Sequence, residues 1–170
     1  MYKRQNDLLL SNLSHYLHKP TKKLKLKKTP NGKPIINGIH FSISHSKNVL
    51  VYAFSLGNQV GIDVESINPA REVLKLAKRY FHPDEFLFLK NFNKQEQAYR
   101  FFQLWTQKEA LCKLDGGRLW FYLKENMLSS KKYTKNNDNP VFIQSYDKIP
   151  QFSLSIASTK EPNEIRFIEK

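Results

Sequence analysis

A run of alternating apolar and polar residues between positions 40 and 67 constrains the fold of this chain most strongly. Three segments in it have the two-residue period of a β-strand: HFSISHS (40–46), NVLVYAFSL (48–56) and VGIDVESI (60–67). Short turn sequences separate them, so the segments predict an antiparallel ladder. The turn GNQ (57–59) predicts a hairpin between the second and third strands.

Helical patterns surround this ladder. An apolar stripe predicts a helix over 7–18. A second helix is expected to begin at Asn68-Pro69 and to run to about Tyr80, and a long helix is expected over 95–114, stopped by Gly116-Gly117. A further helix is expected to begin at Pro83, because proline suits the first helical turn.

The remaining segments complete the prediction of the fold. KKLKLKK (22–28) alternates like a strand with Leu24 and Leu26 facing inward, and TPNGKP (29–34) is a turn. A polar loop over 131–139 precedes two further strands, 141–146 and 152–158. Because the strands and helices are mixed without regular βαβ alternation, we predict one domain of the α+β class.

The composition excludes some kinds of site and favours some classes of partner. The single cysteine, Cys112, excludes an intramolecular disulfide and a multi-cysteine zinc site, and it fits a reducing compartment. The longest early apolar run, Leu8–Leu10, is too short for a signal peptide or a membrane span, so we expect a cytoplasmic protein. With 28 Lys and Arg against 15 Asp and Glu, the net charge of +13 favours polyanionic partners. These include nucleic acid, an anionic membrane surface, a phosphorylated small molecule and an acidic protein.

The segment GIDVE (61–65) carries two carboxylates. Asp63 and Glu65 point to the same side of a strand, whereas Ile62 and Val64 point to the core. Two carboxylates so close repel each other unless a cation lies between them. A D-x-E pair alone is most often a solvated strand face, and the functional alternative is a magnesium site.

The segment QLWTQKEALCKL (103–114) places Trp105, Glu109 and Lys113 on one helical face, four residues apart. An E-x-x-x-K pair alone is most often a surface ion pair, and Trp105 is most often part of the core. Alternatively, Glu109 is a third carboxylate for the metal, and Lys113 meets the phosphate that the metal holds.

Ser44 and His45 supply a hydroxyl and an imidazole near the end of a predicted strand. Adjacent strand residues point apart, which argues against a Ser-His nucleophilic pair. Binding an anion is the more natural use, and an ordinary buried or surface histidine is the alternative. The other histidines have no metal-ligand pattern: His15, His18, His40 and His82.

Four of these segments, taken in order, are far more specific than any one of them. The order GKP (32–34), FSISHS (41–46), GIDVE (61–65) and LWTQKEALCK (104–113) resembles the Sfp-type 4′-phosphopantetheinyl transferases. LAKRYFHPDEF (76–86) also resembles that family, and the likeness covers about Arg4 to Ile156.

The resemblance implies a role for each carboxylate. Asp63, Glu65 and Glu109 would ligate magnesium bound to the pyrophosphate of coenzyme A. Lys113 would contact the phosphate and assist the departure of 3′,5′-ADP. Lys108 belongs to the same motif, and its role stays open.

The resemblance also implies a nucleotide site. Lys33, Ser44 and His45 match positions that hold the nucleotide part of coenzyme A, notably its 3′-phosphate. Arg4 matches a further nucleotide-binding arginine.

The implied reaction moves 4′-phosphopantetheine from coenzyme A to a serine of an acidic apo acyl or peptidyl carrier protein. Fatty-acid, polyketide and nonribosomal-peptide carriers all remain possible. Glu109, or a water that it orients, is the candidate base. A monomer is expected, with neither nucleic acid nor membrane as a partner.

The implied fold has two similar α+β halves related by a pseudo-twofold axis, with coenzyme A in the cleft between them. This chain is expected to begin inside the first half. The predicted boundaries are a shortened N-terminal half over 1–59 and a C-terminal half with the magnesium site over 60–170.

Two rival functions use some of the same residues. A magnesium-dependent nuclease would also need carboxylates, a lysine and positive charge, but it leaves GKP and FSISHS unexplained. A non-catalytic nucleic-acid-binding module could use Lys22–Lys28 and the aromatic residues, but it leaves the carboxylates without a purpose.

Overall fold

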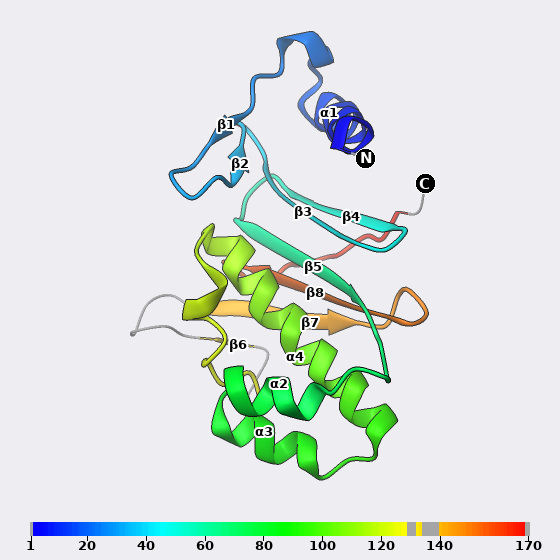
Figure 1. Cartoon of the computed structure of the whole chain (residues 1–170). Helices are drawn as coiled ribbons and strands as arrows, with labels where there is room; N and C mark the ends of the chain where they lie inside the picture. Colours follow the sequence, from blue (N-terminus) through cyan, green and yellow to red (C-terminus); the bar gives the residue numbers. More distant parts are fainter. Residues whose placement is uncertain (1, 129–131, 134–139, 169–170) are drawn as a thin grey trace.

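A long helix, α4 (Lys94–Asp115), lies across a four-stranded sheet in the computed structural model (Figure 1). The structure describes residues 2–128, 132–133 and 140–168, with the side chains of residues 2–4 and 132–133 outside that description. Most of the predicted polar loop over 131–139 therefore lies outside the described residues. The strand order in the sheet is β5 (Val60–Ser66), β8 (Phe152–Ser158), β7 (Val141–Tyr146) and β6 (Lys132–Tyr133).

The N-terminal part contains a helix and two small antiparallel pairs (Figure 1). Helix α1 (Tyr2–Leu17) confirms the predicted helix and begins earlier than expected. β1 (Lys27–Lys28) pairs with β2 (Pro34–Ile35), and β3 (His40–Ser46) pairs with β4 (Val49–Ser55). Leu9 and Leu13 of α1 are buried in one cluster with Ile39 and Phe41.

The strand predicted over 22–28 is wrong. Residues Thr21–Lys23 form a short 3₁₀ helix, η1, in which Leu24 N donates to Thr21 O at 3.0 Å. Only Lys27 and Lys28 pair, because the partner strand β2 has only the two residues Pro34 and Ile35. Leu26, expected to face inward, is 36% exposed.

The hairpin predicted between 48–56 and 60–67 is also wrong. β4 pairs with β3 through a tight turn at Lys47, whose φ is 51°, whereas β5 pairs with β8 in a register that begins at Val60 and Ser158. The residues of β5 from Val60 to Val64 are all buried, so this strand needs cover on both faces. Helix α4 covers one face at Gly61, and Ile62 and Val64 on the other face pack with Val49 and Val51 of β4.

Local capping sets the helix ends. Helix α2 (Val73–Tyr80) begins later than predicted, because Asn68 Oδ1 accepts from Ala70 N at 3.0 Å and holds a turn there. Helix α3 (Pro83–Lys90) begins at the predicted proline after His82, which caps it. Gly116, with φ 64°, ends α4 as predicted, and η2 (Leu119–Phe121) follows.

Helix α4 packs very closely on β5 and β8. A Cβ atom at Gly61 would lie 2.0 Å from Ala110 O, so only glycine permits this approach. On β8 the same face carries Ser153 and Ser155, whose hydroxyls lie 3.0 and 2.8 Å from Thr106 Oγ1. The small side chains bring the α4 residues close to those of β5.

Apolar clusters lie on both faces of the sheet. Ile62 and Val64 are buried with Leu154, which confirms their predicted direction. Trp105 stacks on Phe101 and belongs to the main core, as expected. None of the described helices is long and apolar enough to cross a membrane. The boundaries at 59 and 60 stay a prediction.

Candidate active site

Asp63 of β5 is the centre of a polar cluster between β3, β5 and α4. Its side chain is 4% exposed, and its Oδ1 accepts from Lys113 Nζ at 2.6 Å and from Ser44 Oγ at 2.7 Å. Lys113 Nζ also donates to Ser44 Oγ at 2.8 Å. Burial raises the pKa of the Asp63 carboxyl, and the Lys113 ammonium opposes that shift. The cluster is therefore a buried carboxylate held by one cation and one hydroxyl.

Glu65 and Glu109 belong to the same electrostatic site. Burial and then Asp63 raise the pKa of Glu109 from 4.5 to about 7, and Glu65 adds to the rise. Burial also raises the pKa of Glu65, whose Oε2 accepts from Ser46 Oγ at 2.9 Å. The strand period of GIDVE and the position of Glu109 on α4 thus place Asp63 and Glu65 close enough to raise the pKa of Glu109.

The chemistry of these three carboxylates fits magnesium, which takes oxygen ligands. Asp63 Oδ2 is buried and has no hydrogen-bond partner among the residues that the structure describes, so it could ligate a cation. As the side chains stand, no three His, Cys, Asp or Glu side chains in the described ranges converge enough to hold a metal ion. The cation beside Asp63 is the Lys113 ammonium.

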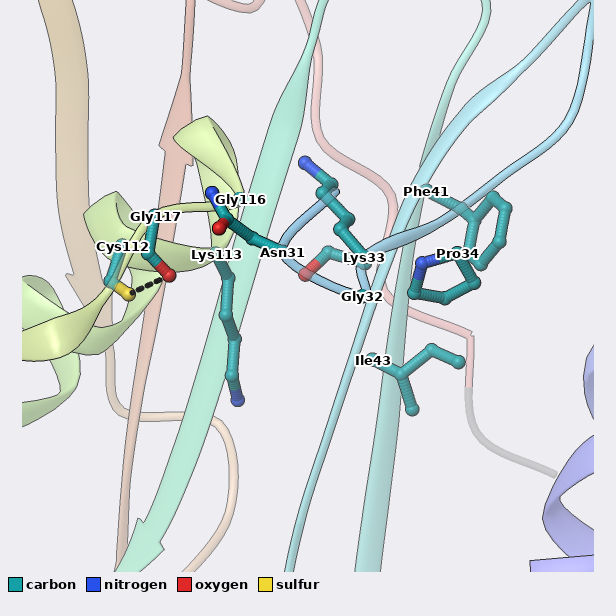
Figure 2. A pocket seen from close by; sticks show the side chains of 11 residues that line it. Asn31, Gly32, Lys33, Pro34, Phe41, Ile43, Cys112, Lys113, Gly116 and Gly117 are labelled. Atoms are coloured by element: carbon teal, nitrogen blue, oxygen red, sulfur yellow. Dashed lines mark hydrogen bonds between the residues drawn. The ribbon is translucent and has the colours of Figure 1, made fainter. Parts of the chain in front are cut away.

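A pocket of about 270 Å³ lies beside this cluster, between the 31–34 turn, β3 and the end of α4 (Figure 2). Lys33 lies on one side of it and Lys113 on the other, and Ser42 and Gly116 also line it. Lys33 Nζ donates to Leu114 O at 2.7 Å. Burial lowers the pKa of Lys33, and the nearby Asp115 carboxylate opposes that shift. Two lysines therefore line the pocket, and their ammonium groups donate to Leu114 O and to Asp63 and Ser44.

The other predicted nucleotide-binding residues lie in different surroundings. Ser44 is buried, and its hydroxyl is engaged by Asp63, Lys113 and Val64 N. His45, the next residue on β3, is exposed on the opposite side of the strand. Arg4 lies in α1, and its side chain is outside the described part of the chain. The structure thus joins Ser44 to the carboxylate cluster and separates it from His45.

Lys108 has a role that the sequence left open. It is fully buried, and its Nζ lies 2.8 Å from Glu85 Oε2 and donates to Glu125 O. Glu85 Oε1 accepts from Met127 N at 2.9 Å. Burial lowers the pKa of Lys108, and Glu85 opposes that shift. Lys108 thus joins α4 to α3 and to the segment after η2, away from Asp63.

Two residues near the cluster were missed in the sequence, Ser42 and Ser46. Their hydroxyls accept from Ile62 N and Ser66 N, both at 3.1 Å. The serines at every second position of FSISHS could have indicated these two residues, because residues two apart on a strand point to the same side. Cys112 is buried, and burial and then Glu109 raise the pKa of its thiol to about 11, so it is a poor nucleophile.

Comparison with known proteins agrees with the resemblance in the four motifs. A family model described as the 4′-phosphopantetheinyl transferase superfamily matches residues 59–163. The chain is 31% identical over 157 residues to the 4′-phosphopantetheinyl transferase gsp of Aneurinibacillus migulanus, which is 89% of this chain and 65% of that protein. It is 35% identical over 115 residues to the 4′-phosphopantetheinyl transferase HetI of a Nostoc species, which is 64% of this chain and 48% of that protein.

A third relative is the 4′-phosphopantetheinyl transferase Sfp of Bacillus subtilis, 30% identical over 138 residues, or 75% of this chain and 59% of that protein. The chain therefore spans between about half and two thirds of the length of these three relatives. The family model covers more than half of the chain, including Asp63, Glu65, Glu109 and Lys113. The chain belongs to the 4′-phosphopantetheinyl transferase superfamily.

Proposed function

We propose that this chain transfers 4′-phosphopantetheine from coenzyme A to a serine of an apo acyl or peptidyl carrier protein, with magnesium, and releases 3′,5′-ADP. The observation that best supports this proposal is the meeting of Asp63, Glu109 and Lys113 beside a pocket that also contains Lys33. A transferase of this kind needs an anion site next to a metal site and a base.

The pocket between Lys33 and Lys113 is the proposed site for the phosphates of coenzyme A. Lys33 lies on a turn that contains Gly32 and Pro34, which limits its backbone freedom. A bound phosphate would favour the charged ammonium, against the burial that lowers the pKa of Lys33. We assign the 3′-phosphate to Lys33 and His45, and a further nucleotide contact to Arg4.

The proposed metal ligands are Asp63, Glu65 and Glu109, and magnesium held there would neutralise charge on the pyrophosphate. Asp63 offers the buried Oδ2 that lacks a partner among the described residues. Lys113, with a flexible four-carbon stem, would leave Asp63 Oδ1 and donate to the departing phosphate.

The proposed base is Glu109, directly or through a water that it orients. A serine hydroxyl is a poor nucleophile unless a base takes its proton. The pKa of Glu109, raised to about 7 mainly by burial, makes its carboxylate more basic than an ordinary glutamate near neutral pH. Metal ligation would lower that basicity.

The proposed acceptor is an acidic carrier protein, in keeping with the net charge of +13. The lone Cys112 fits the reducing cytoplasm, where we propose that the chain acts as a monomer. The carboxylate cluster and the family membership favour this function over a nucleic-acid-binding module.

Mass spectrometry of carrier proteins tests the proposal. The purified chain, magnesium and coenzyme A should add one phosphopantetheine group to an apo carrier. Glu109→Gln should abolish the addition, whereas Glu96→Gln, a change of a half-buried, ion-paired glutamate in the same helix, should not. No adduct on fatty-acid, polyketide or peptidyl carriers would refute the proposal, and magnesium-dependent cleavage of DNA instead would favour the nuclease.

A further inference from the structure

Three serines of β3 take the place of the main-chain hydrogen bonds that a neighbouring strand would make to β5. Strand β3 pairs with β4 and β5 pairs with β8, so the two sheets meet here without a ladder between them. The Oγ atoms bridge the gap, accepting from the N–H groups of every second β5 residue: Ser42 from Ile62 at 3.1 Å, Ser44 from Val64 at 3.3 Å, and Ser46 from Ser66 at 3.1 Å. We name Ser42, Ser44 and Ser46 the serine rungs.

Two of the serine rungs also hold a carboxylate. Ser44 Oγ donates to Asp63 Oδ1 at 2.7 Å, and Ser46 Oγ donates to Glu65 Oε2 at 2.9 Å. Ser42 makes its rung to Ile62 N, and no carboxylate accepts from it among the described residues. The three serines therefore share one structural role, and only two of them touch the proposed metal ligands.

The chemistry of a hydroxyl explains how one serine can accept from an N–H group of β5 and also donate to a carboxylate. Serine has one proton to donate and two lone pairs that accept. The N–H of β5 takes one lone pair, which leaves the proton for the carboxylate. In Ser44 the Lys113 ammonium takes the second lone pair, so its hydrogen-bonding capacity is full. Ser44 could bind a nucleotide phosphate only by giving up Asp63.

We propose that Ser44 and Ser46 are positioning residues, which orient Asp63 and Glu65 for the metal and link that orientation to the docking of β3 against β5. The inference deepens the proposed function, on which its metal part rests. Hydrogen bonds to the side chains that ligate a metal commonly set the orientation of those ligands, and their loss weakens metal binding about 10- to 100-fold.

A double-mutant cycle on the full chain in EDTA tests the link between Ser46 and Glu65 without any metal. Urea unfolding would be measured for Ser46→Ala, Glu65→Ala and the double variant, and again with Ser42→Ala in place of Ser46→Ala. We expect Ser46 and Glu65 to be coupled by roughly a tenfold change in the unfolding equilibrium constant, or about 1.4 kcal/mol. The stability losses of Ser42→Ala and Glu65→Ala should add without coupling, because Ser42→Ala removes only the hydrogen bond from Ile62 N.

A second measurement follows the magnesium dependence of carrier modification. Ser46→Ala should raise the half-saturating magnesium concentration at least about tenfold with little change in the rate at saturation. Ser46→Thr keeps the hydroxyl and should restore the original value. Ser42→Ala can affect coenzyme A binding, because Ser42 lines the pocket, but it should raise the half-saturating magnesium concentration much less than Ser46→Ala does. A merely structural role would make Ser42→Ala and Ser46→Ala behave alike.

The outcomes separate this inference from the proposed function. If the unchanged chain modifies no carrier, the proposed function fails, and the cycle in EDTA still decides whether Ser46 holds Glu65. Equal coupling of Ser42 and Ser46 to Glu65, or equal magnesium shifts in the two alanine variants, would overturn the positioning role. If Ser46→Ala does not fold, Ser46→Thr with a raised magnesium requirement would overturn it as well.

Discussion

The buried ion pair of Lys108 and Glu85 should contribute far more to stability than an exposed pair of the same length. Lys108 Nζ lies 2.8 Å from Glu85 Oε2 with both side chains 0% exposed. Lys75 Nζ lies 2.8 Å from a Glu72 oxygen, but those side chains are 76% and 70% exposed. Replacing each lysine by methionine therefore compares the stability lost when a buried and an exposed ion pair of the same N–O distance are broken.

Lys108→Met leaves the charge of Glu85 buried and removes the donor to Glu125 O. Breaking a buried pair from one side costs about 3–5 kcal/mol. In a chain of this size, each kcal/mol lowers the melting temperature by about 2–4 °C, so we expect a loss on the order of 10 °C. Lys75→Met should cost under about 1 kcal/mol, because water screens that pair.

Urea unfolding followed by circular dichroism measures both losses. Adding Glu85→Gln to Lys108→Met should recover part of the stability, because it removes the unpaired buried charge. Similar losses for Lys108→Met and Lys75→Met would refute this reasoning, as would a double variant no more stable than Lys108→Met. The folded fraction of Lys108→Met should still modify carriers, since Lys108 lies away from the carboxylate cluster.

Three further predictions concern the site and its support. Gly61→Ala should lower the free energy of unfolding by several kcal/mol, because its Cβ would meet the α4 backbone at 2.0 Å, whereas Gly57→Ala, with open space around it, should change little in the same urea titration. Lys33→Ala and His45→Ala should each weaken the binding of coenzyme A about ten- to hundredfold, since a charge-assisted contact is worth about 1.5–3 kcal/mol. The binding of dephospho-coenzyme A, which lacks the 3′-phosphate, should barely change. Equal losses of affinity for the two ligands, measured by calorimetry, would contradict this assignment. Without metal, the folded chain keeps a proton on Glu109 up to about pH 7, whereas the unfolded chain loses it near 4.5, so stability should fall as the pH rises through that window. Urea midpoints measured across this range should fall less in Glu109→Gln.

The sequence correctly predicted the ends of helices that are fixed by capping residues within one turn of the end. His82 and Pro83 mark the start of α3, and Gly116 marks the end of α4, because capping is decided within one turn. The partner of β5 was predicted wrongly, because that choice depends on β8, at the far end of the chain. Residues 22–28 alternate correctly, but a strand also needs a partner of matching length.

In the candidate site, too, groupings within one strand or helix could be predicted, whereas contacts between strands could not. Strand and helix periods were enough to group Asp63 with Glu65 and Glu109 with Lys113. The bond from Ser46 to Glu65 could not be predicted, because it depends on β3 lying beside β5 without pairing with it. Which of these residues bind coenzyme A and magnesium stays a prediction.

The pairing of β5 with β8 also has a consequence for how the chain is made. During synthesis β5 leaves the ribosome well before β8, because Val60 of β5 pairs with Ser158, which follows much later in the sequence. Until β8 follows, β5 has no sheet partner and its apolar side chains Ile62 and Val64 lack their contact with Leu154, a state that favours aggregation and binding by chaperones. The serines of β3, by contrast, are already present when β5 emerges and can cap its other edge at once. A nascent chain stalled before 152 should therefore be far more aggregation-prone than a chain that includes β8.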